Sequence, residues 1–196
     1  MRKSGKAPYV SEQDLEITMS NTSGKNALRN KAVLLFSHFL GLRAKEIAAL
    51  KVGDVYDLKR GELKEVIRLV SAYTKGGKYR EVFLIDEQAK QSVLSYLLTF
   101  RSDYNAEDPL FLSQKNTKFS ANTMQRMIGN LYKKAGVNAS SHSGRRSFAT
   151  RLIHSNADIY SVQQLMGHTS IQTTQVYFSS DPNRLKDVVS RLKSIG

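Results

Sequence analysis

Cysteine is absent from the 196-residue sequence, which excludes disulfide bonds and cysteine-ligated zinc sites. No apolar run approaches the length needed to cross a bilayer, and the basic N-terminal stretch MRKSGKAPYV lacks the apolar segment of a signal peptide. The composition therefore points neither to an oxidising compartment nor to a membrane, and we expect a cytoplasmic protein.

Acidic residues are scarce, since 17 aspartates and glutamates stand against 30 lysines and arginines, and the net charge is +13. Such an excess is typical of proteins that bind polyanions, nucleic acid above all. Charge alone leaves open a merely solvated basic surface and a nucleic-acid binder without catalytic activity. The sequence also lacks a tight cluster of carboxylates, which argues against phosphodiester cleavage by two metal ions, and its histidine spacings do not suit zinc.

Repeats, low-complexity blocks and linkers rich in proline or glycine are absent as well. With 40% hydrophobic residues, the chain is long enough to form a sizeable core. We therefore expect one domain over residues 11–196, preceded by a flexible basic arm at 1–10.

Helical signals begin early in the chain. Ser11 with Asp14 predicts a capping box, and the apolar residues crowded into 25–40 predict a buried helix that ends at Gly41. Ser120 is a candidate N-cap for a later helix with an apolar stripe. Further helices are predicted at 143–154, 159–166, 171–178 and 183–195.

Strand signals are confined to the middle of the chain. Residues 63–70 and 80–85 alternate between apolar and polar side chains, and Gly76 and Gly77 supply a turn between them. We therefore expect an α+β fold that is mostly helical and contains a small antiparallel β-sheet.

Polar residues in the last third of the chain form an ordered set that a packed core does not need. His142 and Arg145 lie three apart in SHSGRRSFAT, on one predicted helical face. In LMGHTSIQTTQVYF, His168 follows Gly167, and Tyr177 lies nine residues beyond it. Together they offer phosphate donors and a hydroxyl nucleophile, which suits chemistry on a phosphodiester.

Four segments together resemble the tyrosine recombinase (phage integrase) family. GLRAKEIAAL is similar to its first-arginine helix, TKGGKYREV to its lysine hairpin, HSGRR to its His-x-x-Arg box, and GHTSIQTTQVY to its Gly-His to Tyr segment. The segments stand in the family's order with near-standard spacing through nearly the whole chain. The resemblance implies the family's catalytic-domain fold.

The resemblance also implies a catalytic set, which consists of Arg43, Lys75, His142, Arg145, His168 and Tyr177. In this set Tyr177 is the nucleophile and Lys75 protonates the departing 5′ oxygen, with Lys78 as the competing choice for the acid. The arginines and histidines stabilise charge in the transition state, and His142 is a candidate acceptor for the tyrosine proton.

DNA contacts are expected from Arg43, Lys75, Lys78, Arg145 and Arg146. Arg146 lies about 100° around the helix from Arg145, so a packing contact is the alternative interpretation for it. Glu46 either orients Arg43 or pairs with other groups on the surface. Gly144 departs from the family pattern, which commonly has leucine at that position.

The implied reaction is the breakage and rejoining of double-stranded DNA by a site-specific recombinase. Attack by the tyrosine gives a 3′-phosphotyrosyl link and a free 5′ hydroxyl, so neither a cofactor nor a metal is expected. Expected partners are double-stranded DNA, further copies of the chain in a tetramer joined through the 183–195 helix, and an accessory protein. A nucleoid-associated protein of a prokaryote, phage or mobile element is expected.

The family's usual N-terminal core-binding domain has no counterpart in this sequence. The chain therefore resembles either the short fimbrial phase-variation invertases or the catalytic part of a longer protein. Two other functions stay open: a type IB topoisomerase, and a non-enzymatic regulator. The regulator would use 159–178 as a helix-turn-helix, with Gly167 at the turn and Thr173, Thr174 and Gln175 facing bases.

Overall fold

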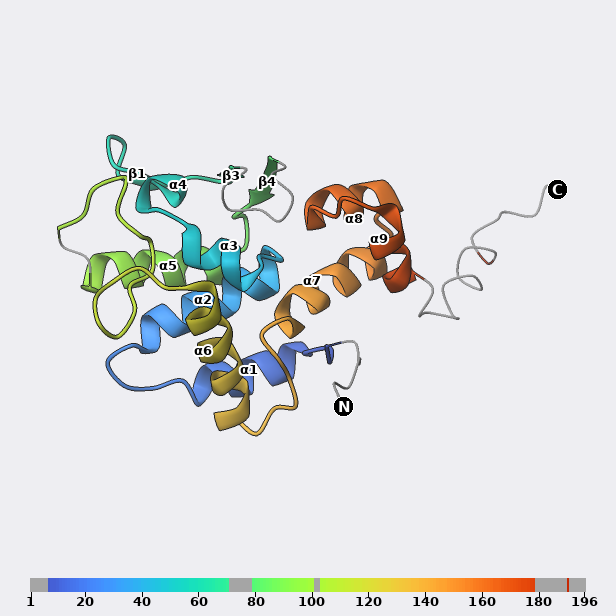
Figure 1. Cartoon of the computed structure of the whole chain (residues 1–196), viewed down its shortest axis with the longest axis horizontal. Coiled ribbons are helices and arrows are strands. Elements are labelled where there is room, and N and C mark those ends of the chain that lie inside the picture. The colour runs from blue at the N-terminus through green and yellow to red at the C-terminus, as the bar shows by residue number, and fades with distance from the viewer. Residues whose placement is uncertain (1–6, 71–78, 101–102, 179–189, 191–196) are drawn as a thin grey trace. The chain divides into compact units, whose positions relative to one another are not determined.

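The computed structural model describes residues 7–70, 79–100, 103–178 and 190, and Figure 1 shows their fold. The helices are α1 (Glu12–Ser20), α2 (Ala27–Phe39), α3 (Ala44–Ala49), α4 (Val52–Val55), α5 (Glu87–Phe100), α6 (Ala121–Lys134), α7 (Ser143–His154), α8 (Ile159–Met166) and α9 (Ile171–Phe178). The strands are β1 (Tyr56–Asp57), β2 (Glu62–Leu63), β3 (Val66–Leu69) and β4 (Arg80–Phe83).

The expected fold class is confirmed, because helices dominate and the strands form small antiparallel sheets. The predicted helices 143–154, 159–166 and 171–178 coincide with α7, α8 and α9. The helix predicted at 183–195 lies, apart from residue 190, outside the described residues. Within the described ranges, no helix combines the length and apolarity needed to span a bilayer.

Capping side chains set the predicted helix starts. Ser11 Oγ accepts from the backbone N–H of Asp14 at 3.0 Å, and Asp14 Oδ2 accepts from the backbone N–H of Ser11 at 3.0 Å. This reciprocal pair confirms the capping box at α1. Ser120 Oγ likewise accepts from the backbone N–H of Thr123 at 3.2 Å and caps α6, as predicted.

The core is centred on α2, where residues 32–38 are all buried. A helix that is buried around its whole circumference needs neighbours on several sides, and α2 packs against α1, α3, α5 and α6. Phe36 of α2 meets Phe111 edge to face, with ring centroids 5.6 Å apart. This packing holds the C-terminal end of α2, where the candidate site begins.

Strands β3 and β4 pair so that one face is buried and the other is exposed. Ile67 lies opposite Val82, and Leu69 lies opposite Arg80; these four side chains are buried. Directly opposed residues of an antiparallel pair point to the same face, so Arg80 shares the core side of the hairpin with three apolar side chains.

The strand predicted over 63–70 is divided in two. Leu63 ends β2 and pairs with Tyr56 of β1, whereas β3 begins only at Val66. Between the strands, the backbone N–H of Lys64 donates to the carbonyl of Val55 at 2.8 Å. The prediction of one long strand over 63–70 was therefore wrong, because the first part of this segment pairs with β1 and not with β4.

The chain divides into two compact units, residues 1–148 and 149–196. The first contains α1 to α6, both hairpins and the start of α7; the second contains the rest of α7 with α8 and α9. A single domain over 11–196 stays a prediction. The two units are described separately below.

Candidate active site

The turn between α2 and α3 places Arg43 at the start of α3. Gly41 follows the C-cap of α2 with φ +63°, a left-handed conformation that favours glycine. A Cβ at this position would also lie 2.3 Å from Cδ1 of Phe148. The glycine therefore allows both the turn and the approach of the Phe148 ring, and Arg43 becomes the N-cap residue of α3.

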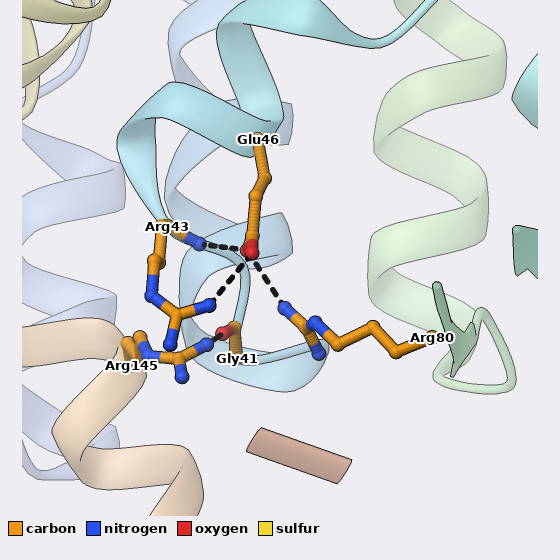
Figure 2. Close-up of polar contacts among 5 residues, drawn as sticks. All are labelled: Gly41, Arg43, Glu46, Arg80 and Arg145. Atoms are coloured by element: carbon orange, nitrogen blue, oxygen red, sulfur yellow. Dashed lines mark hydrogen bonds and ion pairs between the residues drawn. The ribbon is translucent and has the colours of Figure 1, made fainter. Parts of the chain in front are cut away.

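Glu46 is buried and binds two arginines, as Figure 2 shows. Its Oε1 accepts from Nη1 of Arg43 at 2.8 Å, and its Oε2 accepts from the Arg43 backbone N–H at 2.7 Å. Oε2 also accepts from Nη2 of Arg80 at 2.7 Å. Of the two interpretations of Glu46, the structure favours the one in which it orients Arg43.

Charges decide the ionisation state of Glu46. Burial by itself would raise the pKa of this carboxyl, but the positive charges of Arg80 and Arg145, with the backbone bond and charge of Arg43, outweigh it, and the pKa is lowered. The carboxylate is therefore ionised at neutral pH. Since three guanidinium groups surround this single carboxylate, the cluster keeps a positive excess that attracts an anion.

Arg145 comes to the same cluster from α7. The residue is 6% exposed, and its Nη1 donates to the carbonyl oxygen of Gly41 (Figure 2). This bond ties the first turn of α7 to the loop that precedes Arg43. The structure thus brings together two arginines that lie about a hundred positions apart in the sequence, as the predicted phosphate site requires.

Gly144 allows α7 to approach α2 closely. A Cβ at Gly144 would lie 2.8 Å from Oγ and 3.1 Å from Cβ of Ser37. Both distances are shorter than ordinary contacts, so a larger residue would force the two helices apart. The close packing of α7 on α2 therefore explains why glycine, and not the family's leucine, suits this position. The same packing sets the position of α7, the helix that carries Arg145.

His142 precedes α7, and its carbonyl accepts the first helical bond from the backbone N–H of Arg146 at 3.0 Å. It therefore occupies the cap position and not the helix itself, a small correction to the predicted shared helical face. Its side chain is exposed at the surface, yet its pKa is lowered, first by partial burial of the ring and then by the positive charges of Arg145 and Arg43. A lowered pKa favours the neutral imidazole, which can accept a proton.

Arg146 points to a different part of the first unit. Its Nη1 donates to the carbonyl of Ala7, and the next residue, Ser147, accepts through Oγ from the backbone N–H of Val10 at 2.8 Å. These bonds hold residues 7–10, part of the predicted basic arm, against α7. The contact favours the packing interpretation of Arg146; its DNA contact stays a prediction.

The second unit places His168 at the end of α8. Gly167 takes the left-handed conformation with φ +59°, and the backbone N–H of His168 donates to the carbonyl of Gln163 at 3.1 Å. His168 Nδ1 lies 2.9 Å from Oγ1 of Thr174, which is fully buried. This hydroxyl holds the imidazole in one orientation.

Tyr177 lies one turn beyond Thr174 on α9, so both face His168. The rings of His168 and Tyr177 are stacked, with centroids 6.1 Å apart and planes inclined by 10°. The predicted histidine and nucleophile are thus neighbours in the second unit. Thr174 is correspondingly unable to face bases, so its place in the helix-turn-helix interpretation was wrong.

Lys75 and Lys78 lie outside the described residues. Arg43, His142 and Arg145 form one group in the first unit, and His168 and Tyr177 form a second group in the second unit. The sequence analysis missed Arg80, and it considered Thr174 only as a residue that faces bases. The inward orientation of Arg80 could have been predicted, because alternate residues of a strand point to the same face and Val82 and Leu84 are apolar.

A basic pocket of about 670 Å³ lies between α6, the first turn of α2 and the 113–120 loop. Four exposed cations line it, namely Lys115, Lys118, Arg126 and Lys134. The buried Arg29 completes the set, and no aspartate or glutamate is among the lining residues. Such a surface attracts polyanions.

Two anchored arginines lie near a histidine in the first unit, and a histidine is stacked on a tyrosine in the second. Residues 9–184 match the phage integrase family, and the chain belongs to it.

Two relatives at about 30% identity or above resemble most of the chain. The tyrosine recombinase XerD of Oceanobacillus iheyensis is 34% identical over 198 residues, which cover 95% of this chain and 63% of that protein. The crystal structure of XerA recombinase has a TM-score of 0.75 and 30% identity, and covers 97% of this chain and 65% of that one. The chain thus spans just under two thirds of these relatives.

A more distant structure shares the fold. The Tn1549 transposon integrase, solved in complex with transposon right end DNA, has a TM-score of 0.75 at 18% identity, and covers 98% of this chain and 68% of that one. The expected catalytic-domain fold of the family is therefore confirmed.

Proposed function

We propose that this chain is the catalytic part of a site-specific tyrosine recombinase that breaks and rejoins double-stranded DNA through a 3′-phosphotyrosyl intermediate. The observation that carries the proposal is the buried carboxylate of Glu46, which binds Arg43 while Arg145 is anchored nearby at Gly41. A regulator that only binds DNA has no need for arginines fixed in this way. Family membership and the recombinase names of the relatives support the same conclusion.

The arginine cluster suits a phosphate that gains charge in the transition state. A guanidinium carries five N–H donors, so Arg43 can bind Glu46 and a phosphate oxygen at the same time. Because Glu46 and Gly41 hold the two guanidinium groups before DNA binds, little reorganisation is needed during the reaction. Each positioned donor of this kind is typically worth ~3 kcal/mol.

The remaining roles follow the chemistry of each side chain. Tyr177 attacks the scissile phosphate, the 5′ oxygen leaves, and the phosphotyrosyl bond conserves the energy for rejoining. His142, with its lowered pKa, is the candidate proton acceptor. Thr174 holds His168 through Nδ1, so Nε2 is the nitrogen that addresses the phosphate. Lys75, or in its place Lys78, supplies the proton to the leaving oxygen.

DNA is the proposed substrate and partner. The net charge of +13 and the basic pocket along α6 favour a polyanion, and the Tn1549 integrase is a relative in fold with DNA bound. Assembly into a tetramer through 183–195, with or without an accessory protein, belongs to the same proposal. Relaxation of a single duplex without site preference would instead indicate a topoisomerase.

The decisive test is covalent trapping on a nicked suicide substrate. The wild-type chain should form a DNA adduct that resists denaturation, and Tyr177→Phe should abolish it. Tyr160→Phe is the matched control, because Tyr160 is 72% exposed in the same unit and should leave the adduct unchanged. An adduct that persists in Tyr177→Phe, or that maps to Tyr9, Tyr132 or Tyr160, would contradict the proposal.

A further inference from the structure

The arginine cluster contains one member with no role in the reaction proposed above. We infer that Arg80 is a positioning residue, which holds the Arg43 guanidinium in place through the carboxylate of Glu46. The inference rests on the proposed function, because Arg43 is a phosphate donor only there. Arg80 acts indirectly, through Glu46, and needs no contact with DNA.

Arg80 occupies an inward-facing position of β4, where the alternation of side chains along the strand predicts an apolar residue. It lies opposite Leu69 in the β3–β4 register, and Val82 and Leu84 share its inward parity. Its side chain is nevertheless only 5% exposed. Arginine is almost never buried to this degree unless a charged partner compensates for lost hydration, and burial lowers its pKa. Glu46 is that partner.

The two carboxylate oxygens of Glu46 bind different guanidinium groups. Oε2 accepts from Nη2 of Arg80 at 2.7 Å, and Oε1 accepts from Nη1 of Arg43 at 2.8 Å (Figure 2). Figure 2 shows Arg43 and Arg80 reaching the carboxylate from opposite sides. A carboxylate held from one side in this way presents its other oxygen to Arg43 in a fixed orientation. The Arg43 backbone N–H also donates to Oε2, at 2.7 Å, so without Arg80 this oxygen keeps one bond instead of two, and the Arg43 guanidinium is held less firmly.

A purely structural role explains the pair less well. A buried ion pair is often no more stabilising than apolar residues of similar volume, and Leu69, Val82 and Ile67 already fill this face of the hairpin. The pair also connects two segments that differ in kind: β4 of the hairpin and the N-terminus of α3, which carries Arg43. Removing Arg80 should therefore reduce the rate of the chemical step more than it reduces DNA affinity.

The experiment measures single-turnover adduct formation on the suicide substrate, DNA affinity and thermal unfolding for each full-chain variant. Arg80→Gln should form the adduct on the order of 100-fold more slowly, the loss typical of a misplaced catalytic group, with nearly unchanged DNA affinity. Arg80→Lys keeps the charge and should recover at least tenfold of that loss. Arg68→Gln is the matched control, because Arg68 pairs with Glu81 on the exposed face of the same hairpin; its rate should stay within about twofold of wild type.

A double-mutant cycle covers the case in which Arg80→Gln alone does not fold. Glu46→Gln combined with Arg80→Gln removes both charges of this ion pair, so that neither partner stays buried without the other. If Arg80 acts only through Glu46, the double variant should react within about threefold of Glu46→Gln alone. A further loss of tenfold or more would mean that Arg80 contacts the DNA or acts elsewhere, and would overturn the inference.

The wild-type reaction separates this inference from the proposed function. If wild type forms the adduct and folded Arg80→Gln matches its rate, the positioning role is wrong and the proposed function stands. If wild type forms no adduct at all, the proposed function fails. In that case the contact is still testable by following the Glu46 carboxyl by NMR: the pKa of Glu46 should rise in Arg80→Gln, and an unchanged pKa would show that the two side chains do not interact.

Discussion

The two groups of candidate catalytic residues are held by different means. In the first unit, Arg43, Arg80 and Arg145 come from three distant segments and converge on a buried carboxylate and a backbone carbonyl. In the second unit, His168 and Tyr177 lie within ten residues, and one hydroxyl and one ring stack hold them. The first group therefore depends on the core, whereas the second depends on local helix geometry.

Because the two groups are held differently, substitutions in them should affect different properties of the protein. Charges buried in a core are coupled to stability, because any change leaves an unpaired charge in a poorly hydrated site. A tyrosine and a histidine at a partly exposed surface are coupled mainly to orientation. Changes in the first group should thus move stability and rate together, and changes in the second should move the rate alone.

Glu46→Gln should produce the largest effect on stability. The variant removes the charge that compensates Arg80 and Arg43, and breaking a buried pair typically costs about 3–5 kcal/mol. The free energy of unfolding, measured in urea, checks this expectation. Glu81→Gln is the control, since Glu81 pairs with Arg68 at the surface and should cost less than about 1 kcal/mol. Equal losses for the two variants would contradict the coupling of the cluster to the core.

The contribution of Glu46 should also depend on pH in a defined direction. Its pKa is lowered in the folded state, so the ionised carboxylate stabilises the fold above the usual titration range of glutamate, and this stabilisation is lost as the pH falls through the folded pKa. The stability gap between wild type and Glu46→Gln should therefore be full at neutral pH and narrow in acid. Unfolding curves across this range test it, and a gap that widens in acid would show the opposite sign.

Gly144→Ala should have an intermediate effect. The added Cβ would lie 2.8 Å from Oγ of Ser37, and overpacking of this kind typically costs about 1–3 kcal/mol. The displacement of α7 should also slow adduct formation, because α7 carries Arg145. Gly129→Ala in α6 is the matched control: nothing lies within 4 Å of its added Cβ, and this change should stabilise the helix by about 0.5–1 kcal/mol. Stabilisation by both changes would argue against close packing at Gly144.

Thr174→Val should have the smallest effect on adduct formation and stability, and it tests whether the second group depends on orientation alone. It removes the hydroxyl that holds His168 Nδ1, and a hydrogen bond of this kind is worth about 1 kcal/mol, or roughly fivefold in rate. Adduct formation should slow by that factor while the melting temperature changes little. Thr173→Val, on the exposed side of the same helix, should leave the rate unchanged. A large loss of stability with no change in rate would mean that Thr174 serves packing.

Features that depend on neighbouring residues could be predicted from the sequence alone. Helix starts at Ser11 and Ser120 and the helix end at Gly41 follow from local hydrogen bonds and backbone conformation. The spacing from His168 to Tyr177 spans a single turn and helix, so the side chains meet without help from distant segments. The family resemblance extended this reading to Arg43 and Arg145, whose motifs are recognised together with the other two segments and by their order in the chain.

The contacts between groups that are distant in the sequence became known only from the fold. Nothing near Glu46 in the sequence indicates that its second partner is Arg80, 34 residues away, because alternation along a strand predicts the inward face but not the group that meets it there. The contact of Gly144 with Ser37, and the division of 63–70 between two hairpins, have the same cause. Local sequence fixes conformation within a few residues, whereas a partner across the core is selected by the packing of whole elements.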